Sequence, residues 1–237
     1  MFYKNLANVY QHVFPAAGKV DFLADLFKPH GMILDVGCSD GRVALSLSKL
    51  GFDVEAIDLS EDMIRVAKVV SEDNERFRVR LMDMQNVSQH YPAGHFDGVY
   101  CIGNTLVHLE SENKILDTLK AFKSVIKEKG ILMIQIIHYN YVDENQIKML
   151  PIIENEMVRF ERFYARKGEF VKFRTELTIK ETGEFYDSET TLLALKKEQL
   201  EKLLYEAGFR SLEWYGNYNG VPLNSEHLQL IVVAKAF

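Results

Sequence analysis

Residues 32–41, Met-Ile-Leu-Asp-Val-Gly-Cys-Ser-Asp-Gly, decide the fold of this chain. The apolar run at 32–36 predicts a buried strand, the glycine-bearing turn at 37–41 ends it, and residues 42–50 predict a helix. Apolar runs and helix-period segments continue to alternate, which is typical of βαβ units that build a parallel sheet. We expect its strands at 32–36, 54–57, 77–81, 97–102 and 130–137, with a helix before the last strand that ends at Gly130.

The pattern changes after residue 138. Residues 171–180 alternate apolar and polar side chains with a period of two, which predicts a half-exposed strand. Turn signals at 166–169 and 181–184 flank this strand, so residues 157–193 are predicted to form a three-stranded antiparallel meander. A helix that ends at Gly208 and two strands, at 209–215 and 227–235, complete the chain.

The composition argues against several classes of function. The 237 residues include 34 acidic and 28 basic side chains, so the excess of positive charge typical of a general nucleic-acid binder is absent. The apolar runs are far shorter than the roughly 20 residues that span a bilayer. The amino terminus has no signal-peptide pattern, and Cys38 and Cys101 form no spaced framework. We therefore expect a reduced, cytoplasmic protein.

The turn at 37–41 is the predicted ligand-binding segment of the chain. Gly37 and Gly41 let the backbone approach a ligand closely at a helix amino terminus, and Asp58 stands about 20 residues further on, where a carboxylate can accept hydrogen bonds from ribose hydroxyls. This pairing predicts a nucleoside site. A dinucleotide loop would need further glycines, and a phosphate-binding Walker loop would need a terminal Gly-Lys-Ser/Thr. Residues 37–41 also match the G-x-S-x-G elbow of serine hydrolases, but they follow the first strand and not a central one.

Residues 33–41 resemble the first motif of class I S-adenosylmethionine-dependent methyltransferases. Segments 81–84, 96–103 and 206–209 resemble, in order, that family's adenine-contacting segment, its fourth strand and its approach to the sixth strand. The resemblance implies an α/β fold with a Rossmann-like, seven-stranded, mostly parallel sheet, a last strand that is antiparallel, and a small antiparallel β insertion after strand five. It implies S-adenosyl-L-methionine as the cofactor. The residues expected to bind it are Lys19, Asp35, Gly37, Gly41, Asp58, Leu59, Asp83, Met84 and Ile102.

A closer resemblance concerns segments 101–109 and 138–141, which are similar to those of the glycine and sarcosine N-methyltransferase branch. Two positions depart from it. Ser39 replaces the middle glycine of the usual first motif. Tyr139 occupies the position that, by this resemblance, holds an arginine in the glycine-using enzymes, where it binds the substrate carboxylate. The branch therefore implies N-methylation of a small amine, with glycine itself not the expected acceptor.

The acceptor is expected beyond the carboxyl ends of the strands, where open α/β sheets bind ligands. The predicted catalytic residues there are Asn104 and His108, and the predicted substrate-binding residues are Tyr3, Tyr10, Tyr139 and Asn140. We expect an N-terminal helical lid at 1–30, a cofactor-binding core at 31–150 and 194–237, and a β meander at 151–193. The histidines and cysteines show no metal-ligand spacing, so no metal site is predicted.

Alternative functions stay open. One is O-methylation of a small metabolite, another is modification of tRNA through a local basic groove, and a third is a non-catalytic S-adenosylmethionine-binding regulator. We expect a small-molecule acceptor, no membrane partner, and either a monomer or a homodimer.

Overall fold

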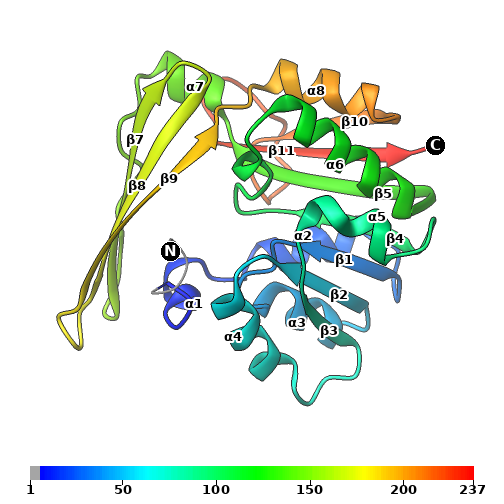
Figure 1. Ribbon diagram of the computed structural model, residues 1–237, viewed down its shortest axis with the longest axis horizontal. Helices are drawn as coiled ribbons and strands as arrows, with labels where there is room; N and C mark the ends of the chain where they lie inside the picture. Colours follow the sequence, from blue (N-terminus) through cyan, green and yellow to red (C-terminus); the bar gives the residue numbers. More distant parts are fainter. Residues whose placement is uncertain (1–5) are drawn as a thin grey trace.

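The computed structural model describes residues 6–237, which build two sheets (Figure 1). The larger sheet has seven strands in the order β10-β11-β5-β4-β1-β2-β3, and the smaller has four in the order β6-β7-β8-β9. This arrangement confirms the predicted α/β class and the antiparallel insertion after strand five. No helix in residues 6–237 is long and apolar enough to cross a membrane.

The seven-stranded sheet is parallel except at β11, which runs antiparallel to both β5 and β10. Its strands are β1 (Met32–Val36), β2 (Asp53–Asp58), β3 (Phe77–Leu81), β4 (Phe96–Cys101), β5 (Ile126–Ile137), β10 (Phe209–Tyr215) and β11 (Gln229–Ala236). β1 lies between β2 and β4, so the carboxyl ends of these three strands meet at one edge of the sheet. The turn at 37–41 leaves the sheet at that edge.

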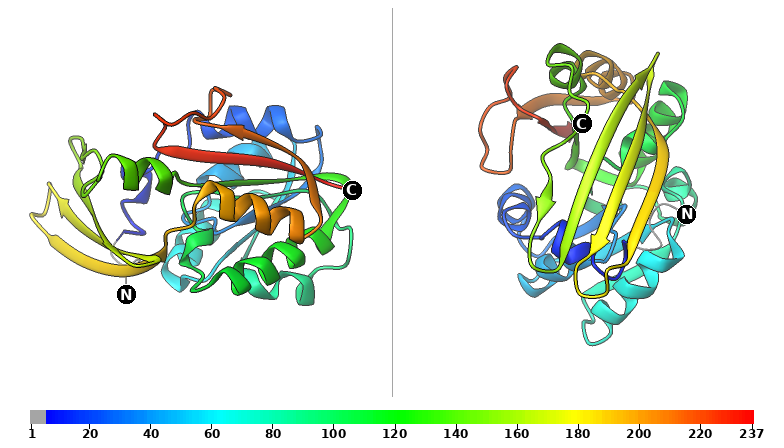
Figure 2. Two further views of the ribbon diagram at one scale, coloured as in Figure 1. Left: turned by 90° about the horizontal axis from the view of Figure 1, so that it is seen from above. Right: turned by 90° about the vertical axis from the view of Figure 1, so that its left-hand side faces the viewer.

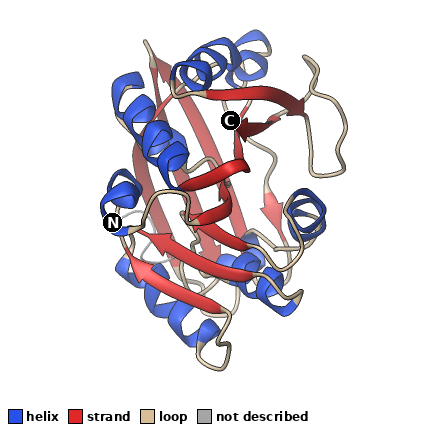
Figure 3. Ribbon diagram, turned by 90° about the vertical axis from the view of Figure 1, so that its right-hand side faces the viewer, coloured by secondary structure: helices blue, strands red, loops and turns tan. Residues whose placement is uncertain are grey.

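Helices cover both faces of this sheet (Figures 2 and 3). Each face of the sheet packs against its own apolar cluster. Successive side chains of a strand point to opposite faces, so Ile33 belongs to one cluster and Leu34 to the other. The helices on the Ile33 face are α2 (Lys19–Leu26), α3 (Arg42–Lys49) and α4 (Glu61–Ser71), and those on the Leu34 face are α5 (Val87–His90), α6 (Glu112–Val125) and α8 (Lys197–Glu206). Two of these helices begin at serine caps: Ser60 Oγ accepts from Met63 N in α4 and Ser111 Oγ from Lys114 N in α6.

One predicted boundary was wrong. The structure ends α6 at Val125 and begins β5 at Ile126, whereas the sequence predicted the helix to end at Gly130. Ile126 already pairs with Phe96 of β4, and the register then shifts before the pairing resumes at Ile131. A Cβ on Gly130 would come within 2.5 Å of Ile126 Cγ2, so this tight bulge requires glycine. Gly130 therefore shapes a bulge within the strand.

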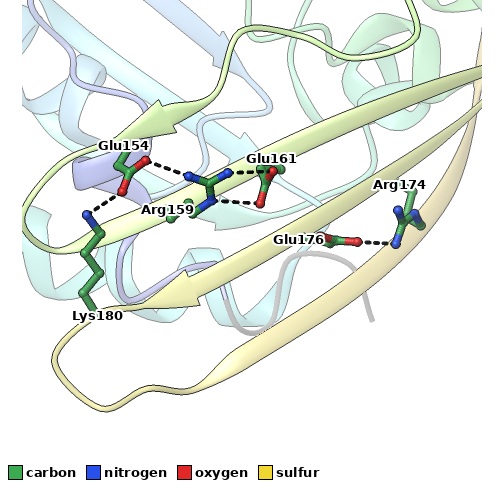
Figure 4. A network of polar contacts seen from close by, with 6 residues as sticks. All are labelled: Glu154, Arg159, Glu161, Arg174, Glu176 and Lys180. Carbon is green, nitrogen blue, oxygen red and sulfur yellow. Dashed lines mark hydrogen bonds and ion pairs between the residues drawn. The ribbon is translucent and has the colours of Figure 1, made fainter.

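The smaller sheet is antiparallel and stands beside the carboxyl ends of the parallel strands (Figures 1 and 2). It consists of β6 (Ile153–Glu154), β7 (Val158–Lys167), β8 (Phe170–Ile179) and β9 (Phe185–Leu193). The three predicted strands are present, and β6 adds a short fourth at the edge. On the outer face Arg159 bonds Glu154 and Glu161, Lys180 bonds Glu154, and Arg174 bonds Glu176 (Figure 4).

The first described residues, 6–14, lie between the two sheets (Figure 1). Helix α1 (Tyr10–Val13) is a single turn, and Leu6 and Val13 join an apolar cluster with Val158 and Phe160 on the inner face of β7. Asn155 Nδ2 donates to the His12 carbonyl at 2.7 Å. These contacts hold α1 against the small sheet.

Candidate active site

The turn after β1 is fixed on the end of β2. The backbone N–H groups of Gly37 and Cys38 both donate to the Ile57 carbonyl, at 2.8 and 3.0 Å. A Cβ on Gly37 would come within 2.4 Å of Thr105 Cγ2, so only glycine fits there. Ser39, at the position of the usual middle glycine, has φ +51° and keeps the left-handed backbone that glycine would adopt easily.

Asp58, at the end of β2, faces this turn. Its Oδ2 accepts from Ser39 N at 2.9 Å and its Oδ1 from Ser60 N at 2.8 Å. A carboxylate has about four acceptor sites, so acceptor capacity remains for a ligand. Burial raises the pKa of Asp58 above its usual value. The side chain lies in the wall of a cavity of about 660 Å³, which we call the donor cavity.

Of the residues predicted to bind the cofactor, the structure places one group around the donor cavity: Gly37, Asp58, Leu59, Asp83 and Met84. Asp83 caps the short helix η1 (Met84–Asn86), because its Oδ1 accepts from Gln85 N at 2.9 Å. The other predicted residues, Lys19, Asp35, Gly41 and Ile102, are not among the described residues that line this cavity. Gly41 is the N-cap of α3 and packs against the Phe77 ring, where a Cβ would come within 2.8 Å.

Asp35 is buried beneath the turn. Tyr100 Oη donates to its Oδ2 at 2.7 Å, while Oδ1 is buried with no hydrogen-bond partner in the described chain. Burial raises the pKa of Asp35 to about 8. Asp40 and Asp58 add negative charge nearby, and Lys19 opposes it. A cluster of carboxyl groups with an unpartnered oxygen suits a ligand that carries positive charge, as a sulfonium donor does.

A second cavity, of about 350 Å³, lies under the small sheet, and we call it the acceptor cavity. The large sheet and its loops contribute Gly103, Asn104, Gln135 and Ile137, among others, and the inner face of the small sheet contributes Phe160, Arg162, Tyr164, Phe173 and Leu192. Ser39, Thr105 and His108 line both cavities. The two cavities therefore meet at these three residues.

Asn104 and His108 lie where the cavities approach each other. Asn104 has φ +67°, its Oδ1 accepts from Ile137 N at 2.9 Å, and its Nδ2 donates to Tyr139 Oη at 3.4 Å. These bonds fix the amide between the ends of β4 and β5. Burial lowers the pKa of His108, in the short helix η2 (Leu106–His108), to about 4. Its imidazole is therefore neutral around pH 7.

The predicted substrate-binding residues separate into different places. Tyr10 lines the acceptor cavity, as does Lys19 from the predicted cofactor set. Tyr139 begins α7 (Tyr139–Glu144) and is buried behind Asn104, whose amide contacts its hydroxyl. Asn140 faces away from the cavities, because its Nδ2 donates to Glu198 Oε2 and its Oδ1 accepts from Lys197 N at the start of α8. Tyr3 falls outside the residues that the structure describes.

Several residues of the site were missed in the sequence. Gln135 Oε1 accepts from Gly103 N at 2.8 Å and from Tyr218 Oη at 3.3 Å, so it holds the loop that carries Asn104. Thr105 lines both cavities. The inner-facing residues of β7, Phe160, Arg162 and Tyr164, also line the acceptor cavity. The period-two alternation of β7 could have identified them as sharing one face of the strand.

Known proteins resemble this chain in both sequence and structure. Residues 33–130 match the family described as a methyltransferase domain. The glycine/sarcosine N-methyltransferase of Aphanothece halophytica is 28% identical over 84% of this chain and 74% of its own length. The methyltransferase CcbJ of Streptomyces caelestis superposes with a TM-score of 0.84 at 16% identity, over 100% of this chain and 98% of its own. An S-adenosylmethionine-dependent methyltransferase of Clostridium acetobutylicum gives 0.82 at 18% identity, over 98% of both chains.

The fold, the matched methyltransferase domain and the sequence relatives together define an α/β, Rossmann-like transferase. The predicted membership of the class I S-adenosylmethionine-dependent methyltransferases is confirmed by the matched domain and these relatives. The protein is a class I S-adenosylmethionine-dependent methyltransferase, and S-adenosyl-L-methionine is its methyl donor.

Proposed function

We propose that this enzyme methylates the nitrogen of a small amine held in the acceptor cavity. The observation that carries the proposal is the meeting of the two cavities at Ser39, Thr105 and His108, since direct transfer requires the acceptor atom to reach the methyl carbon of the donor. The similarity to a glycine/sarcosine N-methyltransferase favours nitrogen as the acceptor atom.

The donor side follows from the acidic residues around the turn. When bound, S-adenosyl-L-methionine supplies a methyl group on a positively charged sulfur. We assign Asp58, which keeps acceptor capacity, to the ribose hydroxyls, and Asp83 and Met84, which line the same cavity, to the adenine. Lys19 is the basic side chain beside Asp35 and Asp40, and we assign it to the donor carboxylate. The carboxyl groups favour the cationic donor over the uncharged thioether product.

The acceptor side must hold an amine in its neutral form, because a protonated nitrogen has no lone pair to attack the methyl carbon. The buried surroundings disfavour an ammonium ion, and the neutral imidazole of His108 can accept a hydrogen bond from an amine N–H without adding a charge that would repel the sulfonium. Asn104 Oδ1 has a second lone pair and can orient the same nitrogen. The proton of the methylated product leaves to solvent.

Of the segment expected as a lid, residues 1–30, we assign residues 6–14 to that role, because α2 packs on the Ile33 face of the sheet and belongs to the core. We assign residues 31–150 and 194–237 to the core as well, and residues 151–193 to a roof over the acceptor. Tyr10 and Phe14 line the acceptor cavity, and the Phe14 ring packs edge-on against Phe160 at 5.8 Å. In this arrangement the amino-terminal segment excludes water from the reacting atoms.

The test measures release of S-adenosylhomocysteine from S-adenosyl-L-methionine and purified protein with amines, amino acids, phenols, carboxylic acids and tRNA, and donor binding is measured on the same protein by calorimetry. We expect turnover with amines, and a methyl group on nitrogen by mass spectrometry. Turnover with phenols or carboxylic acids alone would replace N-methylation by O-methylation. Turnover on tRNA alone, or intact donor binding with no acceptor in any class, would overturn the proposal in favour of the tRNA or regulatory alternative.

A further inference from the structure

Arg162 occupies an unexpected position in the small sheet. Side chains of β7 alternate between the two faces, and the inner row reads Val158, Phe160, Arg162, Tyr164. The other three are buried. A cation in such a row is costly unless its charge is compensated, so its partners decide what it does.

The guanidinium of Arg162 is only partly satisfied. Its Nη2 donates to the Pro151 carbonyl at 2.7 Å, but its Nε is buried with no hydrogen-bond partner in the described chain. It lies about 6 Å from the centres of the rings of Phe14 and Phe160. Burial lowers the pKa of Arg162. No carboxylate of residues 6–237 forms an ion pair with it, whereas Arg159 on the outer face of the same strand bonds two glutamates (Figure 4).

The two cavities also carry opposite charge. The donor cavity is lined by Asp58, Glu61, Asp62 and Asp83. Among the described residues that line the acceptor cavity there is no aspartate or glutamate, while Arg162 lines it together with Lys19, which we assign to the donor carboxylate. A plain alkylamine in its protonated form would be repelled there, and a molecule with a negative group would be attracted.

The size and lining of the acceptor cavity add a second constraint. Its volume of about 350 Å³ lies in the range of pockets that hold drug-sized ligands, so a molecule as small as glycine would leave most of it empty. Aromatic rings form much of the wall, namely those of Tyr10, Phe14, Phe160, Tyr164, Phe173 and Tyr218. An apolar body between two polar ends matches this wall.

We propose that the acceptor is an amino carboxylate with an apolar body, whose carboxylate is bound by Arg162 while its amine reaches the donor beside Ser39, Thr105 and His108. This inference rests on the proposed N-methylation. The carboxylate supplies the charge partner that Arg162 lacks and draws the amine into a cavity that would otherwise repel it. Arg162 then determines specificity and takes no part in the transfer of the methyl group.

The test compares ω-amino carboxylates of increasing chain length with unsubstituted alkylamines of the same length, through release of S-adenosylhomocysteine. We expect wild-type protein to prefer the carboxylate at one length or more by roughly 10- to 100-fold in kcat/KM, the effect of charge-assisted hydrogen bonds. Arg162→Gln should lose that preference through a higher KM for the carboxylate series, so that the ratio of kcat/KM between carboxylate and alkylamine falls toward 1, and Arg162→Lys should recover part of the preference. Arg159→Gln, which changes an arginine on the outer face of the same strand, should keep it.

A binding measurement separates the two proposals. Unbranched alkanoates are titrated by calorimetry into protein saturated with S-adenosylhomocysteine. Binding that is lost in Arg162→Gln supports the carboxylate site even if no amine is methylated; in that case N-methylation and the amine end of the acceptor fail, and the carboxylate site at Arg162 stands. The inference is overturned if no chain length binds, if binding is the same in Arg162→Gln, or if amines are methylated with no preference for the carboxylate series.

Discussion

Replacing Asp58 by alanine is expected to weaken donor binding at least tenfold. The carboxylate accepts from Ser39 N and Ser60 N and keeps acceptor capacity for a ribose hydroxyl. A hydrogen bond to a charged group contributes about 1.5–3 kcal/mol, so the loss of even one such bond corresponds to about 10- to 150-fold in affinity. Calorimetric titration with S-adenosylhomocysteine measures this loss directly.

Asp53 provides a matched control for this variant. It lies at the opposite end of β2 and pairs with Arg76 on the surface, so Asp53→Ala should bind the ligand as wild type does. An analogue of S-adenosylhomocysteine without the 2′-hydroxyl should bind wild type more weakly and lose little further affinity in Asp58→Ala. Wild-type affinity in a folded Asp58→Ala protein, or additive losses for the analogue and the variant, would refute the assignment of Asp58 to the ribose.

Two further variants test the acceptor side and the buried carboxyl group. Asn104→Gly keeps the left-handed backbone that φ +67° requires, and it should lower kcat roughly tenfold or more with little change in donor Kd; equal losses in both would place Asn104 in the donor site. The pKa of Asp35 is raised from 3.8 to about 8, so its ionisation reduces the free energy of unfolding as the pH rises between these two values. Asp35→Asn should therefore raise the Tm of the ligand-free protein by about 2–4 °C or more near pH 8 and leave it almost unchanged near pH 4. A constant difference across that range would show that Asp35 is not the titrating group.

The parallel sheet and the donor turn were predictable from local sequence. Continuous apolar runs mark strands that are buried on both faces, and Gly37 with Asp58 marks the carboxyl ends of adjacent strands. The same kind of pattern predicted the meander, because period-two alternation is visible in nine consecutive residues of β8, 171–179. These features depend on short segments and can therefore be predicted without knowing how the rest of the chain packs.

The acceptor side was less predictable because it depends on how separate elements dock. Tyr139 and Asn140 are neighbours at the start of α7, yet helical geometry turns the first behind Asn104 and the second toward Glu198 of α8. The alternation of β7 divides its side chains into two rows, but which row faces the cavity is set by the packing of the whole sheet beside the core. The position of Arg162 in the wall of the acceptor cavity therefore could not be predicted from the sequence.

The ion pairs on the outer face of the small sheet also bear on how this protein avoids aggregation. A sheet that stands off the core has two open edges, each of which can template a strand from another molecule. At one edge β6 has only two residues, and at the other β9 carries Asp187 and Glu189, which pair with Arg174 and Lys172 of the neighbouring strand. A second β9 laid antiparallel against the first would bring acidic side chains together. The charges that make the outer face polar thus also protect its edges from intermolecular strand pairing, although Phe185 of β9 is 58% exposed.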